Sequence, residues 1–555
     1  MIFFDTEVFS HNWVLIAADI KTGEFTTIID DVPRLKRFYD EHQNEIWVAY
    51  NGKNYDKYIV QGLLTGHDAY KISKHIIGGE QGFTYSDDLR TVPLYIYDPY
   101  NNLSHSLKYY EGCLGLNICE SKIPFDIDRP LTDVEIRETV DYCTYDVKQL
   151  INVFFQDEPY ADFLAQLGLL KMSRPQYISK TKTQLAALIL KAEPCSACGE
   201  FLIDTPETLR LNKYSYVKDW YYKNHDYDSK LETVVAGVPH TFGWGGVHGS
   251  IDKYSYEGNI LVMDVASLYP SLMIEYGLLS NSVRRPELYK ELRDKRLEYK
   301  RAHNPLHQAL KIVLNSTYGA CKDKNNALYD PRQANRVCIY GQLLLLDLIE
   351  HLEPHCKLIQ SNTDGIFITD YDESVIKNIV SEWQSRTRLT LEITEATKII
   401  QKDVNNYLLV MKDGSIKSKG AYLKELTPLD YGDMPIINIA LKEYLLNGTP
   451  IETTINNCNR LIDFQMVVKV TGKFDALYLG DKKLNEKCVC IFAGGDSSIF
   501  KRHTETKALH KISNSPEHCF IDNTDIHNKT AENINKQFYI DLATKRLEEM
   551  NNNDK

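Results

Sequence analysis

Four carboxylates near the start of the chain have the spacing of a cation site. Asp5 and Glu7 stand two residues apart in "IFFDTEV", so on a strand both side chains would lie on one face. Asp56 follows in "YNGKNYDKYIV", and Asp146 follows in "DYCTYDVKQL". Close together, four carboxylates would need divalent cations or strong hydration to offset their repulsion. They therefore predict a two-metal centre that could activate water for phosphodiester cleavage and stabilise the leaving oxygen.

A second pair of carboxylates stands in the middle of the chain. Asp264 ends the apolar run "NILVMD", and Asp364 lies in the polar turn of "KLIQSNTDGIFITD". Alone, an aspartate between polar turn residues and glycine is usually a turn former. Two neighbouring strands would bring these acids together, and the pair could then hold metals that align a hydroxyl for nucleotidyl transfer.

Basic helices are predicted between these two acids. The segment "PLHQALKIVLNSTYGA" places Lys311, Asn315 and Tyr318 on one helical face and apolar side chains on the other. Upstream, "PELYKELRDKRLEYKRA" places Arg296 and Lys300 four residues apart on one side of a second helix. Cations facing two acids suit a nucleoside triphosphate, although a solvated basic hairpin is the alternative if either acid is absent.

The charge of the chain is unevenly distributed. The net charge is −12, but residues 284–336 contain 13 Lys or Arg and 6 Asp or Glu. Attraction to phosphate depends on where charges lie, so the overall acidity does not exclude a nucleic-acid substrate. The spaced lysines and aromatic residues of the last hundred positions favour phosphate contacts there, with a plain solvated surface as the alternative.

The length and composition indicate a large globular protein. Hydrophobic residues make up 43% and charged residues 25% of the 555 positions, and the length predicts two to four domains. No apolar run reaches the roughly 18 residues of a membrane span. The first residues, "MIFFDTEVF", lack the basic start of a secretory signal. We therefore expect a protein without membrane association in the cytoplasm, or in the host cytoplasm if it is viral.

The 12 cysteines predict reduced thiols rather than a disulfide framework. Cys195 and Cys198 form one C-x2-C, but no second pair follows at zinc-ribbon spacing. This spacing favours a turn and leaves a structural metal as the alternative.

The elements that must position these residues follow from periodicity. Short apolar strands open the chain, and helices are predicted over 32–42 and 133–155, so residues 1–160 read as an α/β unit. The stretch "TFGWGGVHGS" holds four glycines and predicts a flexible domain junction. From residue 260 to about 370 the pattern is strand, two helices and strand.

The amino-terminal pattern resembles the three motifs of DEDDy-type 3′–5′ exonucleases. D-x-E, N-x3-Y-D and Y-x3-D occur in that order in this sequence. The resemblance implies that the four carboxylates bind metals, that Tyr142 orients the attacking water and that Asn51 contacts a frayed single strand.

The central pattern resembles family B DNA polymerases. "DVASLYPS" is similar to D-x2-SLYPS, "KIVLNSTYG" to K-x3-NS-x-YG, and "NTDG" to DTDS, with Asn362 in place of an acid and Gly365 in place of the serine. The resemblance implies that Asp264 and Asp364 bind catalytic metals, that the Val265 carbonyl assists them and that Tyr269 excludes a ribose 2′ hydroxyl.

The same resemblance assigns binding roles. It implies that Arg296, Lys300 and Lys311 hold the triphosphate, while Asn315 and Tyr318 line the nascent base pair. "GWGGVHG" is similar to the Y-x-GG link without its tyrosine, and "KSKGAY" to the primer-gripping K-x-Y with one extra residue. The residues implied to contact DNA are Gly245, Gly246, Lys419 and Tyr422, together with Asn51.

The implied fold is multidomain α/β and α+β, with an RNase H-like exonuclease followed by a right-hand polymerase. The expected parts are an exonuclease domain (1–160), a helical connector with the glycine-rich junction (161–250), palm (251–283 and 323–430), fingers (284–322), and thumb with the carboxy-terminal region (431–555). The implied cofactor is Mg²⁺, two per active site, with Mn²⁺ as a substitute. The implied partners are primer–template DNA, deoxynucleoside triphosphates, and a helicase, primase or processivity factor.

The spacing also indicates a subgroup. Asp264 and Lys311 are 47 positions apart, and Lys311 and Asp364 are 53 apart. These intervals leave no room for the two extra segments of protein-primed phage polymerases, so we expect a compact phage-like replicative enzyme without a terminal protein. Two alternatives stay open: a 3′–5′ exonuclease whose synthesis is impaired by Asn362, and a non-catalytic DNA-binding scaffold.

Overall fold

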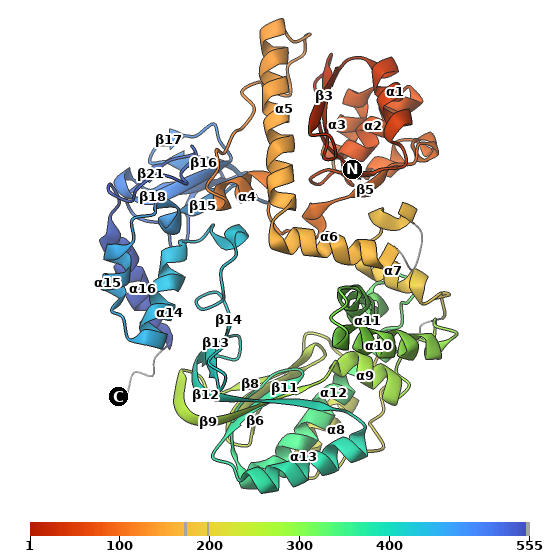
Figure 1. The fold of residues 1–555 in the computed structure, drawn as a ribbon, viewed down its shortest axis with the longest axis vertical. Coiled ribbons are helices and arrows are strands. Elements are labelled where there is room, and N and C mark those ends of the chain that lie inside the picture. The colour runs from red at the N-terminus through yellow and green to blue at the C-terminus, as the bar shows by residue number, and fades with distance from the viewer. Residues whose placement is uncertain (171–174, 197–198, 551–555) are drawn as a thin grey trace. The chain divides into compact units, whose positions relative to one another are not determined.

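The computed structural model describes residues 1–170, 175–196 and 199–550. The protein is a multidomain α/β protein that divides into two compact units, whose elements are labelled in Figure 1. Unit 1 comprises Met1–Ser179, Leu426–Ala440 and Pro450–Asp541, and unit 2 comprises Lys180–Glu425, Leu441–Thr449 and Leu542–Lys555. Over the described ranges, none of the helices has the length and apolar character needed to cross a bilayer.

Unit 1 begins with a five-stranded sheet in the order β3-β2-β1-β4-β5. The strands are β1 (Ile2–Val8), β2 (Trp13–Asp19), β3 (Glu24–Ile29), β4 (Ile46–Val48) and β5 (Tyr95–Tyr97). The helices are α1 (Val32–His42), α2 (Asp56–Thr65), α3 (Ala69–Ile77), α4 (Leu107–Cys113), α5 (Asp133–Phe154) and α6 (Asp157–Leu170). The helices predicted over 32–42 and 133–155 are confirmed as α1 and α5.

Both faces of the central strand β1 are covered. Phe4 packs edge-on against Trp47 on one face, with ring centroids 5.1 Å apart. Phe3 packs edge-on against Phe154 of α5 on the other face, also at 5.1 Å. Because side chains alternate along a strand, Asp5 and Glu7 share the α5 side with Phe3. A capping box between Thr132 and Glu135 fixes the start of α5.

The rest of unit 1 contains two smaller sheets. One is β15 (Met466–Lys469), β18 (Cys488–Ser497) and β21 (Cys519–Ile521), and the other is β17 (Lys482–Lys483), β16 (Phe474–Leu479), β19 (Ile499–His503) and β20 (Leu509–Lys511). Helix α15 (Ile451–Asn457) also belongs to unit 1, whereas α14 (Pro435–Asn447) and α16 (Lys536–Met550) have residues in both units.

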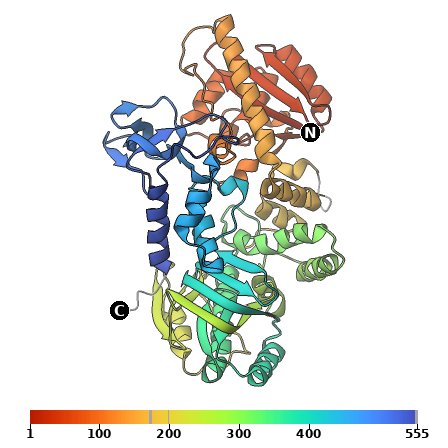
Figure 2. The same ribbon diagram turned by 60° about the vertical axis from the view of Figure 1, so that its left-hand side comes forward.

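Unit 2 is built on a nine-stranded sheet in the order β14-β13-β12-β9-β11-β10-β8-β7-β6. The strands are β6 (Lys230–Val235), β7 (Val238–Gly243), β8 (Gly246–Ser250), β9 (Tyr254–Val265), β10 (Lys357–Ser361), β11 (Gly365–Thr369), β12 (Leu391–Asp403), β13 (Asn406–Met411) and β14 (Ile416–Lys419). Figure 2 shows this sheet from a second direction.

The helices of unit 2 support the sheet and carry basic side chains. They are α7 (Lys182–Ile189), α8 (Ser215–Lys223), α9 (Leu268–Glu275), α10 (Pro286–Arg301), α11 (Leu306–Lys322), α12 (Pro331–Leu352) and α13 (Glu373–Thr387). The two predicted basic helices are confirmed as α10 and α11. Helix α12 is almost entirely buried, and Trp383 of α13 donates a 3.0 Å hydrogen bond to the Leu344 carbonyl. In Figure 1, α12 and α13 lie on the same side of the sheet.

The glycine-rich stretch 241–250 differs from the expectation of a flexible junction. It forms the end of β7, a tight turn and β8, so the segment 161–250 contains the helices α7 and α8 and then ends in three strands instead of a flexible junction. A Cβ at Gly249 would lie 2.4 Å from the ring of His240, and a Cβ at Gly246 would lie 2.8 Å from the Thr363 hydroxyl. These glycines therefore allow close packing inside a regular sheet.

Candidate active sites

The first group of carboxylates, here called the amino-terminal acid site, lies on three elements of unit 1. Asp5 and Glu7 lie on β1, Asp56 is the first residue of α2, and Asp146 lies on α5. One ligand atom each from Asp5 and Glu7 lie within 4.8 Å of each other, and Thr6, which stands between them on β1, donates hydrogen bonds to Asp56. After burial, the charges of Asp56 and Asp146 also raise the pKa of both Asp5 and Glu7. The predicted clustering of these four acids is confirmed.

Burial makes it costly to keep the four carboxylates of this site ionised. Burial is the largest cause that raises the pKa of Asp5 and Glu7 well above their ordinary values. Burial also raises the pKa of Asp56 to about 6, although Thr6 opposes this shift. Thr6 donates to Asp56 Oδ1 from its backbone N at 3.1 Å and from Oγ1 at 2.5 Å. Four carboxylates gathered at one buried place supply the oxygen ligands that divalent cations prefer.

Lys108 of α4 is a site residue that the sequence analysis missed. Its ammonium forms a close ion pair with Asp146 and a second one with Glu111 at 3.3 Å. It also lies 4.7 Å from the ring centroid of Tyr142. Glu111 is fully buried, its Oε2 has no hydrogen-bond partner among the described residues, and burial raises its pKa to about 8. Lys108 is thus the cation that partly balances this group of acids.

The two other residues predicted for this site, Tyr142 and Asn51, differ in their position relative to the acids. Tyr142 is next to the acids, and the charges of Asp146, Glu7 and Asp5 raise the pKa of its hydroxyl in addition to burial. Asn51 lies in the turn after β4 at φ +60°, and its side-chain oxygen accepts a 2.9 Å hydrogen bond from Asn54. The exposed Asn51 side chain is therefore engaged within its own turn.

In unit 2, the two predicted acids converge at one end of the sheet. Strand β9 pairs with β11, and Gly365 is the direct partner of Asp264. The backbone N–H of Val265 donates a 2.7 Å hydrogen bond to the Asp364 carbonyl. Burial and then the charge of Asp364 raise the pKa of Asp264. The convergence expected from the strand pattern is confirmed, and two adjacent carboxylates of this kind fit divalent cations.

A turn with several anchors presents Asp364. The side-chain oxygen of Asn362 accepts hydrogen bonds from the backbone N–H of Asp364 at 3.1 Å and of Gly365 at 2.8 Å. Ser361, at the base of the turn, lies 2.7 Å from Nε2 of the buried His240. A Cβ at Gly365 would lie 2.1 Å from Asp264 Oδ1. Asn362 therefore shapes the turn, and Gly365 lets the two strands approach.

These acids open into a pocket of about 720 Å³, here called the Asp264–Asp364 pocket. Its walls combine acids, cations and aromatic rings from β9, α9, α10, α11 and β12. The sequence-predicted residues that line it are Asp264, Val265, Tyr269, Arg296, Lys300, Lys311, Asn315, Tyr318 and Asp364. The rings of Tyr269 and Tyr318 lie with their centroids 4.3 Å apart. Every residue predicted for metal and nucleotide binding in this region thus borders a single space.

Two features of the pocket wall bear on its charge. Arg296 donates a 2.9 Å hydrogen bond to the Ser267 hydroxyl, while its buried Nε finds no partner among the described residues. Glu392 of β12, which the sequence analysis missed, is the strand partner of Asp264 and lies 4.0 Å from the Lys300 ammonium. The pocket therefore has three carboxylates and three cations along its walls.

The four residues predicted to contact DNA in unit 2 lie outside this lining. Gly246 packs beside Thr363, which does line the pocket, whereas Gly245 faces open space. Lys419 ends β14 and lowers the pKa of His248 after the larger effect of burial. The Tyr422 hydroxyl donates a 3.0 Å hydrogen bond to Glu549. Gly246 is thus the member of this set that packs against the pocket wall.

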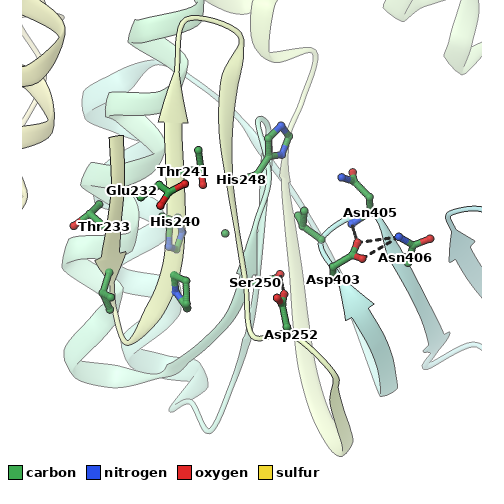
Figure 3. A pocket seen from close by; sticks show the side chains of 14 residues that line it. Glu232, Thr233, His240, Thr241, His248, Ser250, Asp252, Asp403, Asn405 and Asn406 are labelled. Atoms are coloured by element: carbon green, nitrogen blue, oxygen red, sulfur yellow. Dashed lines mark hydrogen bonds between the residues drawn. The ribbon is translucent and has the colours of Figure 1, made fainter. Parts of the chain in front are cut away.

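A second pocket of about 690 Å³ lies over β6, β7, β8 and the turn between β12 and β13 (Figure 3). Asp403 accepts hydrogen bonds from the backbone N of Asn405 and from Asn406, drawn as dashed lines in Figure 3. Ser250 donates a 2.8 Å hydrogen bond to Asp252. None of the sequence-predicted site residues lines this pocket.

The predicted Cys195–Cys198 alternative lies partly outside the described residues, because Cys198 is not among them. Cys195 Sγ lies 3.5 Å from the Ser282 hydroxyl. Among the described residues, the group with the geometry of a metal site that includes a thiol is Asp5, Glu7 and Cys143.

Comparison with known proteins adds sequence relatives. No model of a known protein family matches the chain. The chain is 22% identical over 293 residues to DNA polymerase 1 of Saccharolobus solfataricus, covering 44% of this chain and 32% of that protein. It is 25% identical over 207 residues to DNA polymerase 1 of Aeropyrum pernix, covering 30% of this chain and 22% of that protein. The chain thus spans about a third or less of the length of these curated relatives.

Among solved structures, a family B DNA polymerase from the archaeon Pyrobaculum calidifontis matches with 14% identity and a TM-score of 0.45. That match covers 100% of this chain and 78% of the other. The sequence matches show a distant and partial similarity to DNA polymerases.

Proposed function

We propose that the protein is a DNA-directed DNA polymerase with a 3′–5′ exonuclease activity for proofreading. The observation that carries this proposal is the Asp264–Asp364 pocket of about 720 Å³, whose walls hold two adjacent acids and three cations. This arrangement suits a deoxynucleoside triphosphate, because cations hold its phosphates while the acids hold metal ions. The distant homology to DNA polymerases supports the same reaction class.

For synthesis, each wall of the pocket has a separate task. Asp264 and Asp364, with the Val265 carbonyl, would hold two Mg²⁺ or Mn²⁺ ions, which supply charge stabilisation for phosphoryl transfer. Lys300, Lys311 and Arg296 would bind the triphosphate, and the unpartnered Nε of Arg296 offers it a donor. In the pair of tilted aromatic rings, Tyr269 would exclude a 2′ hydroxyl, and Tyr318 would contact the nascent base pair beside Asn315.

For degradation, the amino-terminal acid site would hold two further divalent cations. Tyr142 would orient the attacking water, and Asn51 would contact the single strand after leaving its present hydrogen bond within the turn. Gly245, Gly246, Lys419 and Tyr422 would contact primer–template DNA. These roles extend the family resemblance to the positions that match its motifs.

The domain plan follows the same proposal. Residues 1–160 would form the RNase H-like exonuclease, 251–283 and 323–430 the palm, 284–322 the fingers and 431–555 the thumb with the carboxy-terminal region. The short intervals on either side of Lys311 support a compact phage-like enzyme that extends nucleic-acid primers without a terminal protein. A helicase, primase or processivity factor would act with it.

A labelled primer–template with Mg²⁺ tests the proposal. With nucleotides the primer should lengthen, and without them it should shorten. Asp264→Asn should abolish lengthening and spare shortening. Asp252→Asn, which changes a carboxylate in the second pocket of the same sheet, should leave both reactions intact.

Two results would favour the alternatives. Shortening without any lengthening in the unaltered protein would favour an exonuclease whose synthesis is impaired at Asn362. No metal-dependent change of the primer at all would favour a non-catalytic DNA-binding scaffold.

A further inference from the structure

A buried thiol lies among the amino-terminal acids. Cys143 of α5 is 0% exposed, and its Sγ lies 3.5 Å from Asp5 Oδ2 and 3.5 Å from the Asp5 carbonyl oxygen. One ligand atom each from Asp5, Glu7 and Cys143 lie within 4.8 Å of one another. Cys143 stands three residues before Asp146, so both project from the same side of α5.

The four carboxylates of this site differ in how they are engaged. Asp56 accepts two hydrogen bonds from Thr6, and Asp146 is ion-paired with Lys108. Glu7 is only 8% exposed, and no described residue donates a hydrogen bond to it or forms an ion pair with it. No hydrogen-bond donor among the described residues therefore offsets the charge of Glu7, which makes a bound cation favourable there. Asp5 and Glu7 are therefore the acids with oxygen atoms left for a bound cation, and the thiol lies beside them.

The spacing of these atoms suits a small thiophilic cation. Tetrahedral Zn²⁺, with bonds of about 2.3 Å to sulfur and about 2.1 Å to oxygen, sets neighbouring sulfur and oxygen ligands about 3.6 Å apart. The observed distance from Sγ to Asp5 Oδ2 is 3.5 Å. Mg²⁺ instead prefers six oxygen ligands, and thiolate selects softer metals.

We propose that Asp5, Glu7 and Cys143 form a binding site for a thiophilic divalent cation, such as Zn²⁺ or Cd²⁺. The cation takes two carboxylate oxygens and the Cys143 thiolate, whose proton is released to solvent on binding. Occupation of this site by such a cation excludes Mg²⁺ from Asp5 and Glu7 and slows degradation. The Asp264–Asp364 pocket has no cysteine in its described lining, so synthesis is not blocked in this way.

The effect on degradation rests on the proposed nuclease function, whereas cation binding does not. The binding test therefore uses the metal-free full-length chain without DNA or nucleotides. Co²⁺ or Cd²⁺ is titrated while the thiolate-to-metal charge-transfer absorbance is recorded. The unaltered protein should show a charge-transfer band, and Cys143→Ser should lack it. The Kd of Cys143→Ser for Cd²⁺ should be about tenfold or more higher than that of the unaltered protein.

Two further variants complete the design. Cys519→Ser removes another buried thiol of unit 1, one whose Sγ donates to the Ser497 carbonyl, and should keep the band. Glu7→Gln keeps the thiol and removes one carboxylate, so it should weaken Cd²⁺ binding even if Cys143→Ser fails to fold. Far-ultraviolet circular dichroism shows which variants are folded.

The outcomes separate this proposal from the proposed function. A band that persists in folded Cys143→Ser, or Cd²⁺ affinity unchanged by Glu7→Gln, overturns the cation site. An intact Cys143-dependent band in a protein that never degrades DNA supports the cation site and overturns the nuclease function instead.

Discussion

The two carboxylate sites balance their negative charge by different means. In the amino-terminal acid site, Glu7, Asp56 and Asp146 are each less than 9% exposed, and Lys108 is the cation paired with them. In the Asp264–Asp364 pocket, Asp264 is half-buried, Asp364 is exposed, and three cations line an open space. Deep burial makes ionised carboxylates costly in the first site, so that protonation, Lys108 or bound cations must offset their charge. The open pocket leaves its cations available for a charged substrate.

The comparison also explains why each site needs its own supporting residues. Lys108 is anchored between Asp146 and Glu111, so it acts within the protein. Arg296, in contrast, has a buried Nε without a described partner, and it points to a ligand from outside. An internal cation suits a site that must stay folded without metals, whereas an unpartnered cation suits a site that binds phosphate.

The largest effect is expected on the stability of the metal-free protein when Lys108, the internal cation, is removed. Lys108→Met leaves Asp146 and Glu111 buried without their counter-charge, which costs about 3 kcal/mol or more in a buried pair. The metal-free protein should therefore unfold at a clearly lower temperature in a thermal melt, with partial recovery on adding Mg²⁺. The matched change at the exposed Lys122 should leave the melting temperature nearly unchanged. Equal melting of both variants would show that Lys108 does not balance the acids.

A smaller effect is expected from removing a cation of the open pocket. Lys311→Ala removes the proposed contact to substrate phosphate, and a hydrogen bond to a charged group contributes about 1.5–3 kcal/mol, or roughly 10- to 160-fold in kcat/KM. Single-nucleotide incorporation on a primed template measures this loss, which should leave stability unchanged. Lys324→Ala, at an exposed position outside the pocket, is the control. Loss of stability without loss of kcat/KM would contradict the substrate role.

The pH dependence of metal stabilisation should sharpen the contrast further. Because burial raises the pKa of Asp56 from 3.8 to about 6, the metal-free folded chain holds a proton there that the unfolded chain has lost. Stability of the metal-free protein therefore falls as pH rises through this interval, and Asp5 and Glu7 act in the same direction. The rise in melting temperature on adding Mg²⁺ should be larger at about pH 8 than at about pH 5. Asp5→Asn should reduce this difference, and a Mg²⁺ effect that is larger in acid would contradict the assignment.

The smallest effect is expected at the position where the family pattern has an acid. Asn362→Asp can keep both turn hydrogen bonds through a carboxylate oxygen, and Glu392 already adds a third acid to the pocket. Nucleotide incorporation should change by less than about tenfold. Asn362→Ala removes the acceptor and should reduce incorporation more. A gain of about 100-fold in Asn362→Asp would show instead that the missing acid limits synthesis.

The sequence predicted the acids better than the residues that balance them. Asp264 and Asp364 could be predicted because one ends an apolar strand and the other lies in the turn between two apolar strands, which is visible in a short window. Glu392 could not, because its place depends on the pairing of β12 with β9 across more than a hundred positions of chain. Lys108 was missed because it lies in no recognisable local pattern, and only the packing of α4 against α5 brings it to the acids. Cys143 stands one helical turn before Asp146, but only the packing of α5 against β1 brings its thiol to Asp5.

The glycine-rich stretch shows a second limit of prediction from sequence. Four glycines in "TFGWGGVHGS" indicated flexibility, yet Gly249 makes room for the ring of His240 and Gly246 for Thr363. Glycine permits close approach as well as freedom, and only tertiary contacts distinguish the two. The strand and helix positions, in contrast, followed from periodicity, as α5, α10 and α11 show.

The most direct test of two separate carboxylate sites is a reciprocal experiment on one labelled primer–template. Lengthening with nucleotides and shortening without them are measured under single-turnover conditions for the unaltered protein, Asp264→Asn and Asp5→Ala. We predict that Asp264→Asn loses lengthening by about 10³-fold and keeps shortening, while Asp5→Ala does the reverse. Parallel loss of both reactions in either folded variant would contradict the assignment of separate activities to the two sites.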